Sequence, residues 1–248
     1  MNDQNDLQTL MKEVNNSSAL KVYRRLVDLK SNFYCLGINH LELSKFITHV
    51  RNNEVWPNLL NPKYPRGIEI TLNETARLLQ NYLASASALV DQTRALIDSG
   101  YKSHSFHEEY ENQIKNRFVG NPIIGFVEDL RNYSLHYSLP VTGANLTFNQ
   151  NESDKISAST ADFILVLDRP SLLLWSNWST KGKPFLNKIT GNQIELSSFV
   201  DPYFNQVNEF HQWMFFRIQE IHSKELSWLE EKDQRIRSLM PNKVQKGM

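Results

Sequence analysis

The residues best suited to chemistry lie close together in the stretch 131–136, which contains Arg131, Asn132 and His136. A histidine side chain can give or take a proton near neutral pH. An arginine is permanently charged and binds a phosphate through two parallel hydrogen bonds, and an asparagine can orient a hydroxyl or an imidazole. Together these side chains suit RNA cleavage by internal attack of the ribose 2′-OH, with Arg131 stabilising the charge on the phosphate and His136 moving the proton. This chemistry needs no metal, and we expect no cofactor.

These residues belong to a predicted helix over about 122–138, which begins with a proline in its first turn. At about 100° per residue, its core face consists of Ile123, Phe126, Val127, Leu130, Tyr133, Ser134 and Tyr137. The opposite, polar face carries Gly125, Glu128, Asn132 and His136, with Arg131 at its edge. Arg131 and His136 are five residues apart, so they lie about 7.5 Å apart along the axis and point in different directions.

The side chains expected to support the three candidate catalytic residues are Glu128, Asp129, Tyr133 and Tyr137. Gly125 lies in the polar face, where a glycine costs about 1 kcal/mol relative to alanine but lets another backbone come close. Apolar residues also fall on this side, which favours a subunit interface or a cleft over open water. The alternative is structural: Arg131 pairs with Glu128 one turn earlier, and His136 is an ordinary surface histidine.

The rest of the chain predicts a mainly α-helical protein. Helices are expected over 18–51, with a bend or break at Gly37, and over 104–118 and 202–239. A further helix is expected from Thr71 to Gly100, because its first residues resemble a capping box. Residues 53–68 and 180–191 have the composition of loops. Segments 141–150 and 156–167 predict a β-hairpin around a polar turn, followed by a short helix over 170–178 and an extended segment over 193–200. We therefore expect one helical domain over 1–248, with a β-containing insertion at about 141–200 and a basic, flexible tail at 241–248.

Composition narrows the possible partners. The 27 basic and 27 acidic side chains cancel, which excludes a broad electrostatic footprint for nucleic acid. Cys35 is the only cysteine, so an internal disulfide framework and a multi-cysteine zinc site are excluded. The polar N-terminus does not resemble a secretory signal, and the apolar run 163–167 is too short to span a bilayer. We expect a soluble, cytoplasmic protein with no membrane partner.

Two further groups of residues have a functional and a structural interpretation. Trp175 and Trp178 could stack on single-stranded RNA, but tryptophans at this spacing more often pack a short helix onto the core. His104 and His107, with glutamates beside them, could bind a metal, but such a pair is more often a surface feature. In both cases we favour the structural interpretation.

The stretch 131–136 also resembles the motif of the HEPN superfamily, in which an arginine, a polar residue and a histidine recur with four to six residues between arginine and histidine. Here four residues intervene, and the first is Asn132. Residues 126–130 before the motif and Leu139-Pro140 after it are similar to a group of bacterial HEPN-like proteins. The motif covers residues 131–136, and a looser likeness extends over 104–140.

The resemblance implies an HEPN-like helical bundle that forms a homodimer through the 122–138 helix, with both Arg-His pairs lining one composite cleft. Many HEPN proteins are metal-independent ribonucleases in toxin–antitoxin or antiviral systems, so Arg131 and His136 would be catalytic and Asn132 would support them. An RNA substrate and an antitoxin or defence partner are then expected. One alternative is a non-catalytic module that binds a nucleotide, an RNA or a protein. Another is an interaction protein in which this face only forms a buried dimer interface.

Overall fold

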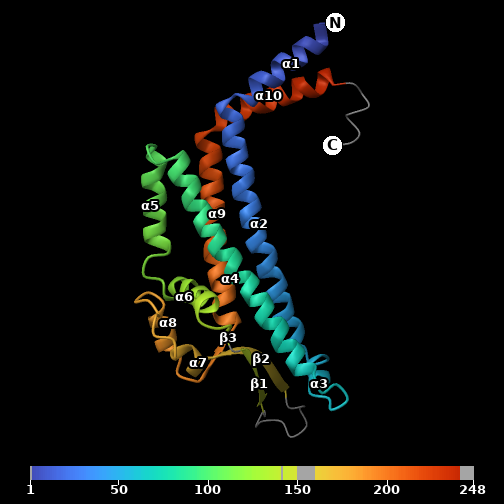
Figure 1. Cartoon of the computed structure of the whole chain (residues 1–248), viewed down its shortest axis with the longest axis vertical. Helices are drawn as coiled ribbons and strands as arrows, with labels where there is room; N and C mark the ends of the chain where they lie inside the picture. Colours follow the sequence, from blue (N-terminus) through green and yellow to red (C-terminus); the bar gives the residue numbers. More distant parts are fainter. Residues whose placement is uncertain (1, 141, 150–159, 241–248) are drawn as a thin grey trace. The chain divides into compact units, whose positions relative to one another are not determined.

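The computed structural model (Figure 1) describes residues 2–140, 142–149 and 160–240. Ten helices are described. They are α1 Asn2–Asn15, α2 Ser18–Arg51, α3 Trp56–Leu59, α4 Gly67–Gly100, α5 Ser105–Arg117, α6 Pro122–His136, α7 Arg169–Leu173, α8 Lys183–Lys188, α9 Ser197–Ile221 and α10 Ser223–Leu239. The strands are β1 Thr142–Asn149, β2 Thr160–Asp168 and β3 Gln193–Glu195. The prediction of a mainly α-helical protein with a small β-hairpin is confirmed.

The contacts divide the chain into two compact units, one formed by residues 1–31 with 211–248 and the other by residues 32–210. Both boundaries fall inside long helices, one within α2 and the other within α9. The expectation of a single domain therefore stays a prediction. All candidate catalytic residues lie in the second unit, and the expected basic tail at 241–248 lies outside the described residues.

In the first unit, α1 packs against α10. The ammonium of Lys232 lies 3.2 Å from the carboxylate of Glu13 and 5.2 Å from the centre of the Trp228 ring. The side chain of Ser17 starts α2 by accepting a hydrogen bond from the Leu20 amide at 3.1 Å. Burial lowers the pKa of His211 in this unit to about 4.

The second unit is built around α4 and α6. The core face predicted for α6 is wrong at Tyr137, which lies just beyond the helix and is exposed, and Ile123 and Ser134 are only partly buried. It is confirmed at Phe126, Val127, Leu130 and Tyr133, which are all buried. They pack in one apolar cluster with side chains from α2, α4, β2 and α9, including Leu43, Leu79, Leu83, Leu167 and Phe199. One face of α6 thus belongs to the core, and its other side remains available to form a site.

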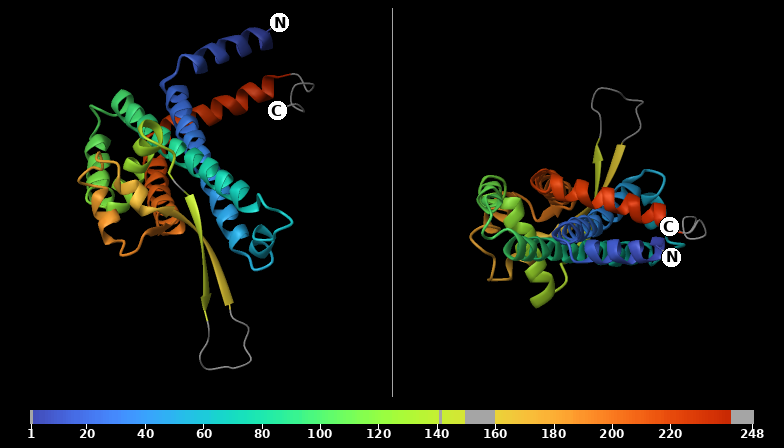
Figure 2. Two further views of the ribbon diagram at one scale, coloured as in Figure 1. Left: turned by 60° about the horizontal axis from the view of Figure 1, so that its bottom comes forward. Right: turned by 90° about the horizontal axis from the view of Figure 1, so that it is seen from above.

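The three strands form an antiparallel sheet in the order β1-β2-β3. β1 pairs with β2 from Thr142↔Leu167 to Asn149↔Thr160, as the hairpin prediction required. Figure 2 shows these two strands as a narrow ribbon that extends away from the helices of their unit. Most of the polar turn predicted between them falls in 150–159, outside the described residues.

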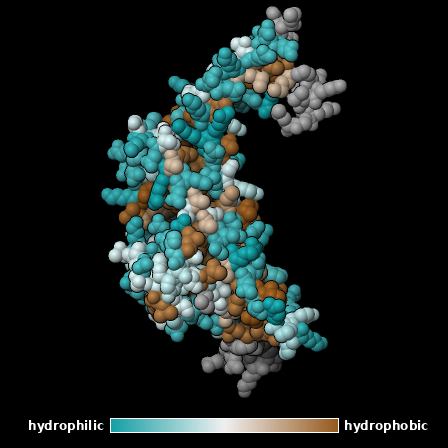
Figure 3. Space-filling model, in the orientation of Figure 1, coloured by the Kyte–Doolittle hydropathy of each residue, from teal (hydrophilic) through white to brown (hydrophobic). Residues whose placement is uncertain are grey.

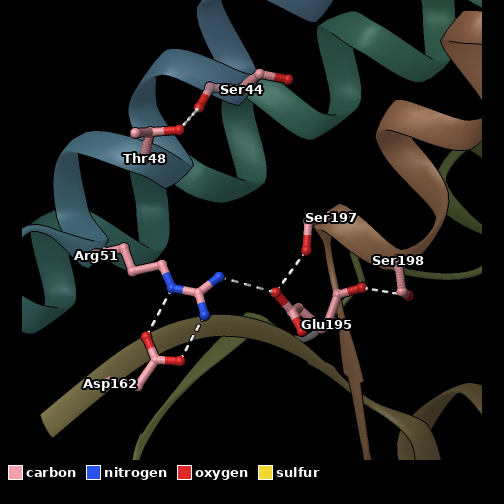
Figure 4. A network of polar contacts seen from close by, with 7 residues as sticks. All are labelled: Ser44, Thr48, Arg51, Asp162, Glu195, Ser197 and Ser198. Atoms are coloured by element: carbon pink, nitrogen blue, oxygen red, sulfur yellow. Dashed lines mark hydrogen bonds and ion pairs between the residues drawn. The ribbon is translucent and has the colours of Figure 1, made fainter. Parts of the chain in front are cut away.

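Arg51, at the end of α2, joins that helix to two strands of the sheet (Figure 4). Its guanidinium donates at 2.5 Å and 2.6 Å to the two carboxylate oxygens of Asp162 on β2. It also lies 3.5 Å from the carboxylate of Glu195 on β3. A two-point contact of this kind fixes orientation as well as distance, so it holds the C-terminal end of α2 against the strands.

Several predicted boundaries are wrong. Gly37 lies inside α2 without interrupting it, and the segment 53–68, predicted to be a loop, contains the short helix α3. The helix predicted to start at Thr71 begins at Gly67. The hydroxyl of Thr71 donates to the Gly67 carbonyl at 2.9 Å. It is therefore an interior helical residue that bonds one turn back, and no capping box starts there.

The segments after the hairpin also differ from prediction. The short helix expected over 170–178 ends at Leu173, and α8 forms inside the segment expected to be a loop. Of the extended segment 193–200, only residues 193–195 form a strand. The final helix is divided at His222. The sequence did not predict this break, because periodic apolar residues run through both halves.

Contact between α6 and the segment before α8 explains the glycine in the polar face of α6. A Cβ atom built on Gly125 would lie 2.5 Å from the Lys181 carbonyl carbon and 2.7 Å from the Gly182 nitrogen. Gly182 has the matching constraint, because its Cβ would meet the Gly125 carbonyl and the carboxylate of Asp129. The prediction that Gly125 admits another backbone is confirmed, and that backbone comes from the same chain.

The surface carries no sign of a membrane segment: across the described ranges, no helix has the length and apolar character required to cross a bilayer. The face shown in Figure 3 is mostly hydrophilic or intermediate, and hydrophobic atoms reach it in separate patches. Leu135, Tyr137 and Leu139, around the end of α6, are each about half exposed (50%, 54% and 50%). These three apolar side chains lie on both sides of His136 in the sequence, next to the candidate site.

The Gly125 contact predicts a clear difference between two glycine-to-alanine variants. We expect Gly125→Ala to lower the free energy of unfolding by about 2 kcal/mol or more, because its methyl group must displace backbone atoms. Gly37→Ala is the matched control, since a Cβ there meets nothing within 4 Å, and it should stabilise the protein by about 0.5–1 kcal/mol. Urea unfolding of both variants measures this difference; an equal effect of the two would contradict the contact.

The buried His211 predicts a loss of stability in acid. Its pKa is about 4 in the folded protein and about 6.5 in an unfolded chain, so the unfolded chain binds more protons between these values. The free energy of unfolding should therefore fall as the pH drops from about 6.5 to 4, by up to about 3 kcal/mol from this group. Comparison of urea unfolding at several pH values for the wild type and His211→Phe tests it, because the variant should lose this part of the slope.

Candidate functional site

The α6 helix is fixed at both ends by local hydrogen bonds. The side chain of Asn121 accepts a hydrogen bond from the Ile123 amide at 3.0 Å and donates one to Gln206 on α9 at 2.7 Å. At the other end, the amides of Tyr137 and Ser138 both donate to the Tyr133 carbonyl, at 3.0 Å and 3.1 Å. This closing turn ends the helix at His136, two residues earlier than predicted.

Arg131 is partly buried and has no carboxylate partner among residues 2–140, 142–149 and 160–240. Its Nη1 donates to the side-chain oxygen of Asn132 at 3.1 Å. Its Nε is buried and has no hydrogen-bond partner among the described residues. Glu128 is exposed and forms no ion pair there, so the alternative of an Arg131–Glu128 pair is wrong. The guanidinium thus keeps donors available for an anion.

Arg131 lies between two cavities. The larger cavity, about 380 Å³, is lined by α4, α6, residues 179–181 and Tyr203 of α9. The smaller cavity, about 260 Å³, lies between α4 and α6 alone. Besides Arg131, both cavities are lined by Leu83, Ser87 and Asp91 of α4. The candidate site is therefore a pair of hollows along one helix–helix contact, with Arg131 between them.

The other two candidate catalytic residues are placed differently. Asn132 lines the larger cavity and holds Arg131 through its side-chain oxygen. His136 lines neither cavity and is exposed at the last residue of α6. It has no hydrogen bond or ion pair with any part of the chain that the structure describes. One copy of the chain thus brings Arg131 and Asn132 together but leaves His136 apart, as the five-residue spacing requires.

The four residues predicted to support the site have different roles. Asp129 is buried and its carboxylate accepts hydrogen bonds from the Ser179 amide at 2.9 Å and hydroxyl at 2.8 Å. Glu128 is exposed and lines the larger cavity. Tyr133 belongs to the core, where burial raises the pKa of its hydroxyl. Tyr137 is exposed, with its ring centre 5.2 Å from that of Tyr133.

The Asp129–Ser179 contact shapes the wall of the larger cavity. The Ser179 hydroxyl, held by Asp129, also accepts hydrogen bonds from the Lys181 and Gly182 amides at 3.2 Å each. Together with the close Gly125–Gly182 approach, this fixes the turn that carries Thr180 and Lys181 at the cavity. Asp129 therefore positions the site through the neighbouring segment.

The structural interpretation of the two tryptophans is confirmed. Trp175 and Trp178 are both buried. The Trp178 indole donates to the Leu172 carbonyl at 2.7 Å, and its ring stacks on Phe126 at 5.6 Å between centres. These rings pack against the core face of α6 and are not available for bases to stack on.

His104 also has a structural role. Its Nδ1 accepts a hydrogen bond from the Phe106 amide at 3.0 Å and so caps the start of α5. Over the described ranges, no three His, Cys, Asp or Glu side chains are grouped so as to hold a metal ion.

A group of one histidine, one serine and one aspartate outside the predicted site was not predicted from the sequence. His40 and Ser44, four residues apart on α2, meet Asp201 of α9: the His40 Nε2 lies 2.8 Å from the carboxylate, and the Ser44 hydroxyl donates to it at 2.9 Å. That hydroxyl also lies 3.2 Å from the same Nε2. A serine nucleophile needs its base to use one ring nitrogen for the hydroxyl and the other for the carboxylate. Because one nitrogen meets both here, the cluster ties α2 to α9 and does not activate the serine.

Three charged residues of the larger cavity were not connected with Arg131 from the sequence, namely Asp91, Arg94 and Lys181. The spacing of Asp91 and Arg94 in α4 marks them only as neighbours on an exposed helix face. Lys181 lies fifty residues from Arg131 in the sequence, and no local pattern connects the two. Only the packing of α4 and the 179–181 turn against α6 brings them together.

Comparison with known proteins adds no relative: no protein-family model, curated protein or solved structure matches this chain. The HEPN resemblance therefore rests on the residues around the motif.

Proposed function

We propose that this protein is a metal-independent endoribonuclease of the HEPN type, acting in the cytoplasm as a toxin or phage-defence effector. The observation that carries the proposal is Arg131, a partly buried guanidinium that lines a cavity and forms no ion pair with a carboxylate of the described residues. Keeping such a cation without a partner is costly unless it has an anion to bind. A phosphodiester is the anion that a forked guanidinium matches best.

In the proposed reaction, the ribose 2′-OH attacks the adjacent phosphorus and the bond to the 5′-oxygen of the next nucleotide breaks. His136 takes the proton from the 2′-OH and water supplies one to the departing 5′-oxygen, while Arg131 stabilises the charge that develops on the phosphate oxygens. Asn132 fixes the guanidinium through its 3.1 Å hydrogen bond. The products are a 2′,3′-cyclic phosphate and a 5′-hydroxyl, and no redox partner is required.

His136 does not reach the Arg131 cavities within one chain, so the proposal includes a homodimer through the 122–138 helix. The exposed apolar side chains around the end of α6 support this interface, because a group of half-exposed apolar residues favours a protein contact. In such a dimer, His136 of the partner subunit would act beside Arg131. An antitoxin or defence partner would then control the dimer or cover its cleft.

A second candidate is a non-catalytic module of the same type that binds a nucleotide, an RNA or a protein. The observation that favours it is the position of His136, which lines neither cavity that Arg131 lines. Phosphate binding would then need Arg131 and Asn132 but not the histidine.

Cleavage of RNA by the pure protein in excess EDTA is the direct test of catalysis. We expect the wild type to cleave a mixture of structured and unstructured RNAs and to leave 2′,3′-cyclic phosphate ends. His136→Ala and Arg131→Ala should each lose at least about 100-fold in rate, the usual contribution of a proton-transfer or charge-stabilising group. His49→Ala is the matched control, because His49 is an exposed histidine on α2. Cleavage by all four proteins at the same rate would reject the catalytic proposal, and intact RNA with the wild type would favour the binding module.

The dimer is tested by a charge placed in the exposed apolar group. We expect Leu139→Lys to shift the protein from dimer to monomer in light scattering after size-exclusion chromatography, because a charge in an apolar interface is costly. Leu60→Lys, which alters a leucine of similar exposure (48%) near α3, should leave the dimer intact. A wild type that is monomeric at all concentrations would contradict the dimer.

A further inference from the structure

The two cavities beside Arg131 share one wall of α4. Leu83, Ser87 and Asp91 recur every four residues and so follow one side of that helix. Arg131 faces this row and is the only residue of α6 that lines both hollows. A group bound at the guanidinium would therefore have space on either side of it.

We propose that the site has two unequal subsites for single-stranded RNA: Arg131 holds one phosphodiester, the nucleotide on one side of it enters the larger cavity, and the nucleotide on the other side enters the smaller one. This inference rests on the proposed function and adds the form of the substrate. An unpaired strand is required because bases paired in a duplex cannot turn into separate hollows.

The larger cavity has the chemistry to distinguish bases. Its lining includes the carboxylates of Asp91 and Glu128, which accept hydrogen bonds from amino groups, and Thr180 and Lys181, which donate to carbonyl and ring nitrogen acceptors. Three cations and three carboxylates line it, so its formal charge balances and net charge alone does not select the ligand. Its volume of about 380 Å³ is within the usual range of small-ligand pockets.

The smaller cavity has a different lining. Beyond the shared wall and Arg131, its lining consists of Ala84 and Ala88 of α4 and Leu135 of α6, together with the polar side chains Gln80 and Ser134. An apolar hollow of about 260 Å³ can accept the flat face of a base without demanding a particular pattern of donors and acceptors. The site should therefore select the base on one side of the phosphate and tolerate any base on the other.

Binding of 2′-O-methyl dinucleoside monophosphates, which cannot be cleaved by internal attack, tests the two subsites by calorimetry. For the wild-type protein we expect the dissociation constant to vary by about tenfold or more with one base and by much less with the other. Each dinucleotide should bind about tenfold more tightly than the matching mononucleotides, which lack a group for the second cavity.

Variants assign each subsite to its cavity. Ala88→Phe fills the smaller cavity from an exposed position, and we expect it to weaken all dinucleotides by about tenfold without changing the base preference. Ala84→Phe should do the same and serves if the first variant unfolds. Lys181→Met should flatten the base preference, and Gln92→Phe, on an exposed part of α4 outside both cavities, should change neither property.

Equal affinity for mononucleotides and dinucleotides, or unchanged binding by both alanine variants, would overturn the two-subsite proposal. Because these ligands cannot react, the result is independent of catalysis. Subsite binding without RNA cleavage would reject the ribonuclease and keep the subsites. Cleavage together with unchanged binding in the variants would keep the ribonuclease and reject the subsites.

Discussion

The contact on which the candidate site depends is the approach of the Gly125 and Gly182 backbones. Two chain segments can come this close only where neither carries a Cβ atom. The carboxylate of Asp129, one turn along α6, then accepts the Ser179 amide and hydroxyl and holds the turn in place. A buried carboxylate is stable only when such donors surround it, so the glycines and the Asp129–Ser179 bonds stabilise each other.

This arrangement assigns different functions to adjacent positions of one helix. Gly125 and Asp129 hold the 179–182 segment, while Arg131 lines both cavities and Asn132 lines the larger one. Phe126 and Tyr133 face the core, where Trp178 and Trp175 pack on them. The α6 helix is thus anchored on two sides, and its remaining strip is rigid enough to orient a guanidinium without an ion pair.

Local pattern predicted the features of α6 that depend on helix geometry. Its start at Pro122, the four buried residues of its core face and the close approach at Gly125 all follow from residue types and a period of 3.6. The segment that approaches Gly125 could not be predicted, because Gly182 lies 57 residues away in the sequence. A glycine indicates only that some backbone can come close to it. The polar strip with apolar residues therefore favoured a subunit interface or a cleft without distinguishing them, and part of the strip is covered by the same chain. Ser44 and Asp201, and Arg51 with Asp162, likewise meet only through packing.

The distance between Arg131 and His136 is the constraint that decides what one copy of the chain can do. Five residues correspond to about 500° of rotation, so the two side chains diverge by about 140° as well as lying about 7.5 Å apart along the axis. The Tyr133 carbonyl accepts both following amides and so holds the last turn of the helix in this arrangement. Arg131 is directed toward α4, and His136 toward the exposed end of α6. The two side chains are therefore separate within one chain, and the proposed chemistry, which uses both residues on one phosphate, needs the second from another copy.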